Sequence, residues 1–193
     1  MKKTHFLAVT AALTTCVALA FTSQDPQEAG APSAEALARM SPGPMHAKLE
    51  PLIGTWHMNG KWRMTPDATW ETFEATVVRE WILDKRFVRE DVESEFMGQP
   101  FKGMGLIGYD NTREQFTMVW VENLSTGTWL TTGQLKGNTL TFEGTNSDAM
   151  TGEKNRWGKS VLDLSRDEQT YKGYCKDAQG KEFMSMEMVA KRK

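Results

Sequence analysis

The sequence predicts an all-β protein: an antiparallel up-and-down barrel of about ten strands with a short capping helix at its N-terminus. Three observations lead to this fold. From Gly54 onward, apolar side chains recur at every second position, as in strands that bury one face. The runs are joined by hairpin-length turns such as Asp84-Lys85 and Lys136-Gly137-Asn138. No crossover helix interrupts them, so neighbouring strands run antiparallel, and closure into a barrel removes bare edges.

The first twenty residues have the pattern of a secretory signal peptide. Two lysines precede an apolar run from Phe6 to about Ala20, which is too short for a comfortable membrane span. Ala18 and Ala20 are the small residues that signal peptidase requires, so we expect cleavage after Ala20. Lipid attachment at Cys16 is the alternative, and the bulky Thr15 before it argues against it. The mature chain then has no transmembrane segment and is exported, either to a periplasm or out of the cell.

Composition limits the partners of the mature chain. Loss of two lysines with the signal lowers the basic side chains from 23 to 21, against 25 acidic ones, a net charge of about −4. No basic patch indicates nucleic acid or an anionic membrane. Cys175 is the one cysteine left, so no intrachain disulfide can form. Stability must come from packing, with seven Trp and nine Phe as the main contributors.

Two segments precede the strands. Residues 21–44 are rich in Pro, Ala, Ser and Gly and are predicted to be a flexible tether. Within it, a turn or two of helix is expected over 33–40, with Ser33 as its N-cap and Pro42-Gly43-Pro44 as its stop. Residues 45–193 then form the barrel domain.

A helix of about two turns is expected just before the first strand. Met45, Leu49 and Leu52 fall at helical spacing, and Pro51 and Gly54 end the segment. The strands that follow are predicted at 54–64, 69–82, 86–97, 101–109, 114–122, 127–135, 138–145, 155–165, 169–176 and 181–192.

Alternation assigns an inner face to some of these strands. In the first strand, the large apolar residues share one parity, and Thr55, His57, Asn59, Lys61 and Arg63 share the other. On the first strand, the residues expected to face the barrel interior are Trp56, Met58, Gly60, Trp62 and Met64. On the fifth strand they are Phe116, Met118 and Trp120, and on the last strand they are Met184, Met186, Met188, Ala190 and Arg192.

Three glycines mark the fourth strand. Gly103, Gly105 and Gly108 match the spacing of a dinucleotide-binding fingerprint, but they run through a strand into a Tyr109-Asp110-Asn111 turn and not into a helix. We expect them to let the strand bend or to leave space in the lumen.

A Gly54-x-Trp56 opening after a short helix, with Arg192 at the end of the last strand, resembles the lipocalin and calycin pattern. That resemblance implies that Arg192 lies across the Trp56 ring at the closed end of the barrel. A cation on an aromatic face is worth roughly 1 kcal/mol when desolvated. Trp56 and Arg192 are therefore a predicted structural pair.

A closer resemblance covers nearly all of the mature chain. It rests on four segments: His46-x-x-Leu49-x-x-Leu52-x-Gly54-x-Trp56, Trp81-Ile82-Leu83-Asp84-x-Arg86-Phe87, Gly98-Gln99-Pro100-Phe101-x-Gly103-x-Gly105-x-x-Gly108-Tyr109-Asp110-Asn111, and Trp120. Together they resemble the secreted bacterial family catalogued as domain of unknown function 1579. The resemblance implies a lipocalin-like barrel and no established activity.

The histidines exclude one further analogy. Heme-binding barrels of the nitrobindin type look similar in the opening helix and Gly-x-Trp, but they hold heme by a histidine late in the chain. Here the mature chain has His46 and His57, both early. His57 has outward parity, and His46 is expected to be structural, with a polar contact to ligand as the alternative. Neither belongs to a metal-binding motif, so we expect no metal and no cofactor.

The remaining candidate reactive side chains are methionines of the last strand and one cysteine. Met184, Met186 and Met188 on one face could hold Cu(I), for which thioethers are suited, but methionine as apolar filling is the favoured reading. Cys175 has no late histidine partner, and no Gly-x-Ser-x-Gly elbow occurs. No catalytic residue is therefore assigned.

One acidic residue departs from the pattern of a solvated strand face. Glu90 shares parity with Val88, Val92 and Phe96, and Arg79 on the neighbouring strand is placed to neutralise it. A buried carboxylate must be paired or protonated. Inside a barrel, such a pair is either a structural tie or the polar anchor of a ligand site.

The leading hypothesis is an exported, non-enzymatic barrel that binds a small apolar or amphipathic molecule in its lumen. Two alternatives stay open: an enzyme that uses Glu90 and Arg79 on a small ligand, and a packed barrel without ligand. A cavity of about 300 Å³ or more would separate the first two from the third. The predicted ligand-binding residues are Met58, Trp62, Arg79, Glu90, Met118, Trp120 and Met186.

Overall fold

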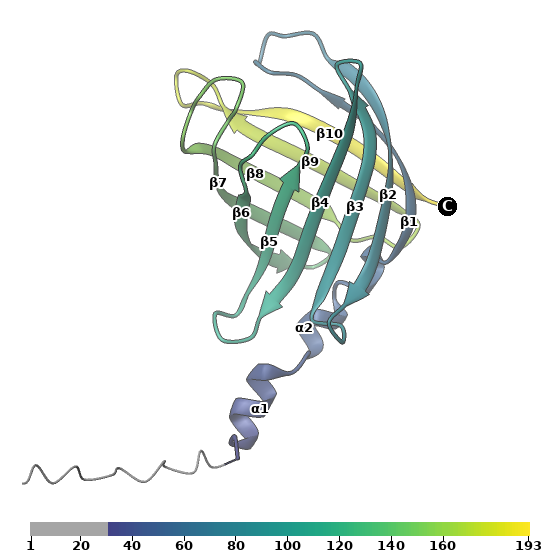
Figure 1. The fold of residues 1–193 in the computed structure, drawn as a ribbon, viewed down its shortest axis with the longest axis vertical. Coiled ribbons are helices and arrows are strands. Elements are labelled where there is room, and N and C mark those ends of the chain that lie inside the picture. Colours follow the sequence, from purple (N-terminus) through teal and green to yellow (C-terminus); the bar gives the residue numbers. More distant parts are fainter. Residues whose placement is uncertain (1–30) are drawn as a thin grey trace, which may run out of the picture. The chain divides into compact units, whose positions relative to one another are not determined.

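The computed structural model describes residues 31–193, so the expected signal peptide and residues 21–30 of the expected tether lie outside the described residues. Ten strands follow one another antiparallel, and the first pairs with the last to close a barrel (Figure 1). The predicted fold class is therefore confirmed, and each predicted strand end lies within two residues of the observed one. The strands are β1 (Gly54–Trp62), β2 (Glu71–Ile82), β3 (Phe87–Phe96), β4 (Gln99–Asp110), β5 (Gln115–Glu122), β6 (Trp129–Lys136), β7 (Thr139–Asn146), β8 (Arg156–Asp163), β9 (Glu168–Lys176) and β10 (Glu182–Arg192).

Three short helical segments precede β1. They are α1 (Ala34–Met40), α2 (Pro44–Ala47) and the 3-10 turn η1 (Glu50–Leu52). Ser33 caps α1, its hydroxyl oxygen accepting the Ala36 N–H at 3.1 Å. The two-turn helix expected after it is instead one α-turn followed by η1. The reason is Pro51, which has no N–H to donate to the carbonyl four residues back.

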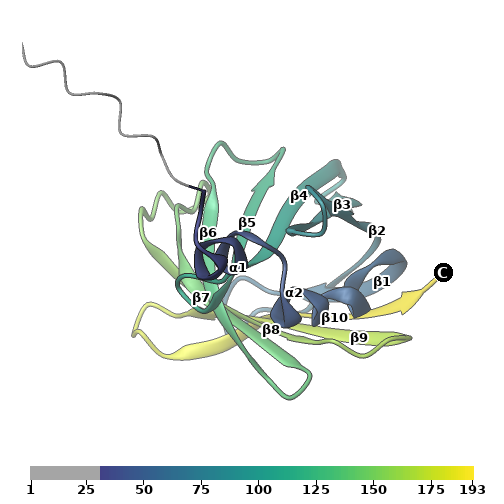
Figure 2. The ribbon, with the colours of Figure 1, turned by 90° about the horizontal axis from the view of Figure 1, so that it is seen from below.

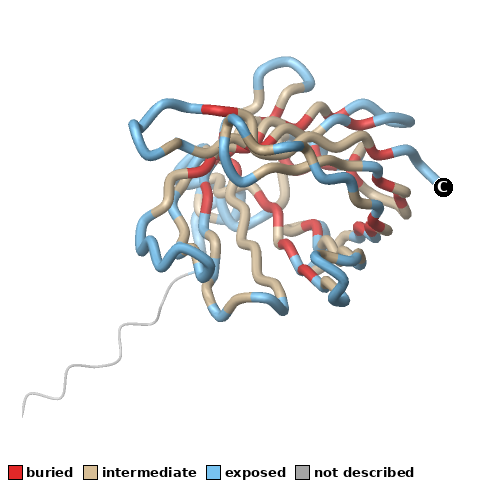
Figure 3. Tube along the Cα trace, turned by 90° about the horizontal axis from the view of Figure 1, so that it is seen from above, coloured by how far each residue is buried: buried red, intermediate tan, exposed pale blue. Residues whose placement is uncertain are grey.

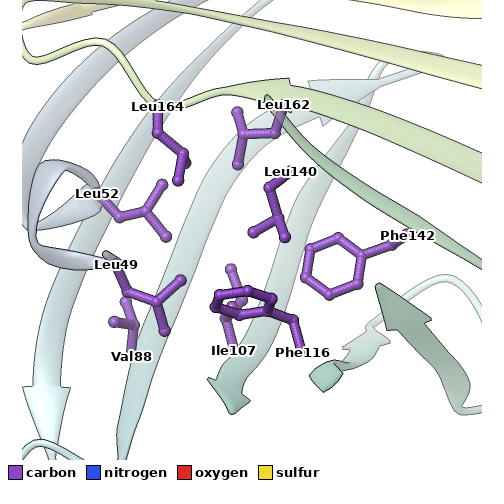
Figure 4. Close-up of a cluster of buried hydrophobic side chains, with 9 residues drawn as sticks. All are labelled: Leu49, Leu52, Val88, Ile107, Phe116, Leu140, Phe142, Leu162 and Leu164. Carbon is purple, nitrogen blue, oxygen red and sulfur yellow. The ribbon is translucent and has the colours of Figure 1, made fainter. Parts of the chain in front are cut away.

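The segment before β1 closes one end of the barrel. Leu49 and Leu52 are fully buried there, in a core with residues from β3, β4, β5, β7 and β8 (Figure 4). Figure 2 looks at this end, where α1 and α2 lie in front of the strands. We call it the closed end. Its core, the closed-end core, consists of Leu49, Leu52, Val88, Ile107, Phe116, Leu140, Phe142, Leu162 and Leu164.

Hydrogen bonds join α1 to the turns of the closed end. The Asn111 side-chain amide donates to the carbonyls of Arg39 at 3.1 Å and Ser41 at 2.8 Å. Arg86 Nη2 donates to the Met40 carbonyl at 3.2 Å. The opposite end, which carries residues 63–70, 97–98, 123–128, 147–155 and 177–181 between the strands, is the open end. Among residues 31–193, no helix is long and apolar enough to span a bilayer.

A β-bulge interrupts the alternation of β10. Met186 pairs with Gly173, but Met184 pairs with Tyr174, so the register shifts between the two methionines. Met184 therefore lies on the face opposite to Met186 and Met188, and Phe183 takes the inner position beside Cys175. The expected row of three inward methionines was wrong, because an extra residue in one strand reverses every side chain beyond it.

Candidate functional site

The inner face changes character between the two ends of the barrel. Next to the closed-end core it carries buried polar side chains, and toward the open end it carries aromatic rings that are only partly buried. Figure 3 looks at the open end, where exposed residues gather in the loops and intermediate ones run along the strands. The candidate site is this half of the barrel interior.

Arg79 and Glu90 form a buried ion pair on the inner face. They are direct partners across β2 and β3, and their side chains are 5% and 13% exposed. Arg79 Nε donates to Glu90, and Arg79 Nη1 donates to Gln169 Oε1 at 3.1 Å. Gln169 in turn donates to the carbonyls of Pro51 at 2.9 Å and Ser165 at 3.0 Å. The pair is thus connected through Gln169 to the segments that close the barrel.

Tyr171 supplies a neutral polar group close to this pair. Burial raises the pKa of its phenol to about 12, the Ser160 hydroxyl opposes the shift, and the negative charge of Glu90 adds to it. Tyr171 therefore keeps its proton at any physiological pH and can donate a hydrogen bond. The alternation of Gln169, Tyr171 and Gly173 along β9 was a signal for this inward position that the sequence reasoning did not use.

A cavity of about 810 Å³ lies toward the open end. It is lined by β1, β2, the end of β3, the turn between β3 and β4, and β10. Its aromatic walls are Trp62, Phe73 and Phe96, and the Trp62 and Phe96 ring centroids are 4.8 Å apart. Met97 and Met188 add apolar surface. The volume exceeds the 300 Å³ or so at which ligand sites begin.

The glycines of β4 do not enlarge the lumen as expected, because aromatic rings occupy the space beside them. On the inner face, a Cβ atom at Gly103 would overlap the Trp120 indole. Gly108 is the direct partner of Phe87 on the outward parity of β4, so it does not border the lumen, and a Cβ atom there would overlap the Phe87 ring. Trp120 also stacks with Phe101, with ring centroids 6.4 Å apart. Glycine is required at position 103 because an indole ring packs directly on its backbone.

Trp129 carries an unpartnered donor on the inner face. It is the direct partner of Trp120, and its ring packs on Gly158. Its Nε1 is the one buried side-chain nitrogen or oxygen in residues 31–193 without a hydrogen-bond partner. Such an atom costs free energy unless something accepts its hydrogen.

The predicted ligand-binding residues are distributed over both halves of the interior. Trp62 is the only one of the seven that lines the 810 Å³ cavity. Met186 is its direct partner on β10. Met58 is 5% exposed in a cluster with Trp56, Ala75, Val77 and Ala190, and Met118 packs against the closed-end core. Trp120 packs on Gly103, and Arg79 and Glu90 form the buried ion pair.

Residues missed by the sequence reasoning make up most of the cavity wall. Phe73 and Phe96 had the parity of Arg79 and Glu90, so their inward direction was available from the sequence. Their closeness to Trp62 was not, because alternation gives a face and not the height of a residue in the barrel. Met97 follows β3 in its turn to β4, a position that no period predicts.

Trp56 and Arg192 lie together at the closed end. The Arg192 guanidinium is 4.4 Å from the centroid of the buried Trp56 ring. Trp56 Nε1 donates to the Leu52 carbonyl at 2.8 Å. Arg192 donates to the carbonyls of Ile53, Pro51 and Arg166, which ties the last strand to η1 and to the β8–β9 loop.

The two histidines lie away from the cavity. The Nδ1 atom of buried His46 accepts the Gly43 N–H at 3.1 Å. Its pKa is lowered from 6.5, chiefly by burial and also by the Arg86 charge, while a backbone hydrogen bond with Tyr109 opposes the shift. His57 pairs with Thr76 and Lys191 on the outward parity of β1.

Other candidate reactive groups are placed as follows. Cys175 Sγ is 3.4 Å from Ser185 Oγ, with the thiol free. The bulge separates Met184 from Met186 and Met188, so the three thioethers do not share one face as the copper alternative required. Within the part of the chain that the structure describes, no group of three or more His, Cys, Asp or Glu is placed to hold a metal.

Comparison with known proteins gives a family and a fold. A solved structure titled "Crystal Structure of Rv2717c from M. tuberculosis" is 18% identical, with a TM-score of 0.60, and the match covers 79% of this chain and 99% of that one. At this identity the likeness shows the fold alone. None of the curated proteins matches the chain. The family model described as "Protein of unknown function (DUF1579)" matches residues 41–192, so the chain belongs to that family.

Proposed function

We propose that the barrel is a non-enzymatic carrier that binds a small apolar or amphipathic molecule in its lumen. The observation that carries the proposal is the cavity of about 810 Å³ with walls of Trp62, Phe73 and Phe96. Aromatic side chains offer a ligand a large apolar contact area. A packed barrel would have no such space.

One polar feature of the lining supports an amphipathic ligand. Glu71, the direct partner of Trp62, places a charged group beside the aromatic rings at the rim. The donors of Tyr171 and Trp129 lie elsewhere on the inner face and do not line this cavity, so they do not bear on its ligand.

Binding is favoured over catalysis by the position of the ion pair. Arg79 and Glu90 do not line the 810 Å³ cavity, and Arg79 is held by Gln169, which is itself bonded to the closed end. A group so constrained is suited to stabilising the barrel, whereas a general acid or base must reach the reacting atom.

The proposal is tested by titrating N-phenyl-1-naphthylamine, a neutral apolar fluorophore, into the exported protein while recording tryptophan quenching. We expect saturable binding, weakened about tenfold or more by Trp62→Ala, since an aromatic wall is removed. Trp157→Ala is the matched control, because Trp157 lies on the outward parity of β8 between Lys159 and Lys176. Absence of saturable binding, or equal losses in both variants, would refute lumen binding.

Export is the second part of this proposal. The lysines and apolar run of residues 1–20 support it. The mass of the protein recovered outside the cytoplasm should correspond to a chain that begins at Phe21. A recovered chain that keeps residues 1–20 would contradict cleavage after Ala20.

A further inference from the structure

We propose that the ligand of the open-end cavity is an organic cation, an ammonium group attached to an apolar body. This inference rests on the proposed lumen binding and adds the charge of the ligand. It comes from two features of the cavity: the aromatic rings of its wall, and the inward carboxylate of Glu71 at its rim, which has no ion-pair partner among residues 31–193.

The wall brings aromatic rings from three consecutive strands to one place. Trp62 of β1 and Phe96 of β3 lie with centroids 4.8 Å apart at an interplanar angle of 39°. Phe73 of β2 is the direct partner of Gly60, and its ring fills the place of the missing side chain. Aromatic faces carry negative electrostatic potential and attract ammonium groups, most strongly where water is excluded. The same rings also accept an apolar body.

The charges that line the cavity are unequal. Four glutamates contribute to its lining, but Glu74, Glu95 and Glu187 lie on the outward parity of their strands. Glu71 alone shares the inward parity of Phe73. Lys61 is the one basic residue in the lining, and its Nζ is 2.9 Å from Glu187, which neutralises both. Within residues 31–193, Glu71, Glu74 and Glu95 have no ion-pair partner within 4.0 Å. Glu71 is the direct partner of Trp62, so its carboxylate starts from the inner face at the rim.

The rest of the inner face at the open end also carries a carboxylate without a basic partner among the described residues. Glu122 is the direct partner of Gly103 at the open end of β5, on the inward parity of Trp120. The basic residues of inward parity in β2 and β8 are neutralised, since Arg79 pairs with Glu90 and Arg156 pairs with Asp148. Among residues 31–193, the open half of the lumen therefore holds Glu71 and Glu122 without an ion-pair partner. Walls of one sign with low-dielectric surroundings concentrate ligands of the opposite charge.

The inference also explains why the cavity can stay open in water. Carboxylates at the rim remain hydrated without a ligand, so they carry no desolvation cost until one binds. An ammonium group placed at the rim beside Glu71 keeps part of its own hydration. Its apolar body then contacts Trp62, Phe73 and Phe96. An anionic amphiphile of equal length gains the same apolar contact and is repelled at the rim.

The test compares three probes with the same ten-carbon chain: decyltrimethylammonium and decyl sulfate below their critical micelle concentrations, and 1-decanol below its solubility limit. Binding to the exported protein is measured by isothermal titration calorimetry in 50 mM and 500 mM NaCl. We expect the cation to bind at least tenfold more tightly than the sulfate at low salt, with a smaller ratio at high salt because the rim charges are screened.

Variants locate the effect. Glu71→Gln should weaken decyltrimethylammonium about three- to fivefold and leave 1-decanol unchanged. Glu80→Gln is the control, since Glu80 lies on the same strand, is exposed and does not line the cavity. Equal affinities for cation and sulfate, with 1-decanol bound, would overturn the charge inference and leave lumen binding standing. If none of the three probes binds, lumen binding and the inference fall together.

Discussion

Gly103→Ala tests whether β4 at this position packs against the Trp120 ring or borders open space in the lumen. The added methyl group would overlap the Cζ2 and Cη2 atoms of the indole. Trp120 is a rigid ring that packs on the β4 backbone and stacks with Phe101, so moving it away disturbs both contacts. Adding a methyl group to a packed site typically costs about 1–3 kcal/mol, and we expect the free energy of unfolding to fall by that amount.

Gly105→Ala is the matched control on the same face of the same strand. There the nearest atom to a new Cβ is Trp120 Cε3 at 3.4 Å, an ordinary contact. Restricting the unfolded chain offsets any tighter packing, so its stability should stay within about 0.5 kcal/mol of wild type. Urea unfolding followed by circular dichroism gives both values. In a Trp120→Leu background the cost of Gly103→Ala should largely disappear. Equal stabilities for the two alanine variants would refute this account of β4.

Three further predictions concern the closed end and the ion pair. Glu90→Gln leaves the buried Arg79 charge uncompensated and should lower the free energy of unfolding, measured in urea, by about 3 kcal/mol. Glu93→Gln, on the outer face, should lower it by less than about 0.5 kcal/mol. Similar losses in the two variants would contradict a buried Arg79–Glu90 pair. Arg192→Lys removes the guanidinium group that donates to three carbonyls, so the free energy of unfolding should fall by about 1–2 kcal/mol. An unchanged urea midpoint would show that these hydrogen bonds do not stabilise the barrel. Because the folded-state pKa of His46 is lowered from 6.5, the unfolded chain binds the proton first. Stability should therefore be full above pH 6.5 and fall as the pH drops below it, and His46→Gln should flatten that slope; an unchanged slope would show that other groups cause it.

Much of the architecture could be predicted because a barrel repeats one simple rule. Alternation marked the strands, and short turns between them left antiparallel neighbours as the only simple connection. The rule failed at Ser185, where Met184-Ser185-Met186 alternates as regularly as any strand in the sequence. A bulge inserts one residue without changing that pattern, so only the pairing with β9 shows it.

The site was harder to predict than the fold because it depends on neighbours across strands. Parity correctly grouped Glu90 with Phe96 and Arg79 with Phe73, but it did not show that the charged residues lie near the closed end and the rings at the open end. It also could not show that the Trp120 ring would cover Gly103. Register and ring orientation decide which inward residues border empty space, and both arise from contacts between distant parts of the chain.

The closed end of the barrel carries the packing that stabilises the fold, and the open end carries the proposed ligand site. At the closed end Leu49 and Leu52 have no exposed surface, and truncating such a side chain to alanine costs about 2–5 kcal/mol. At the open end Trp62 and Phe96 keep part of their surface exposed, so their removal forfeits less burial and leaves no closed void. Substitutions at the rim should therefore change ligand affinity more than the free energy of unfolding. Because the rim contributes little to stability, its side chains can be substituted, and the ligand changed, without unfolding the barrel. The closed-end core does not tolerate such substitutions, because its packing stabilises the fold.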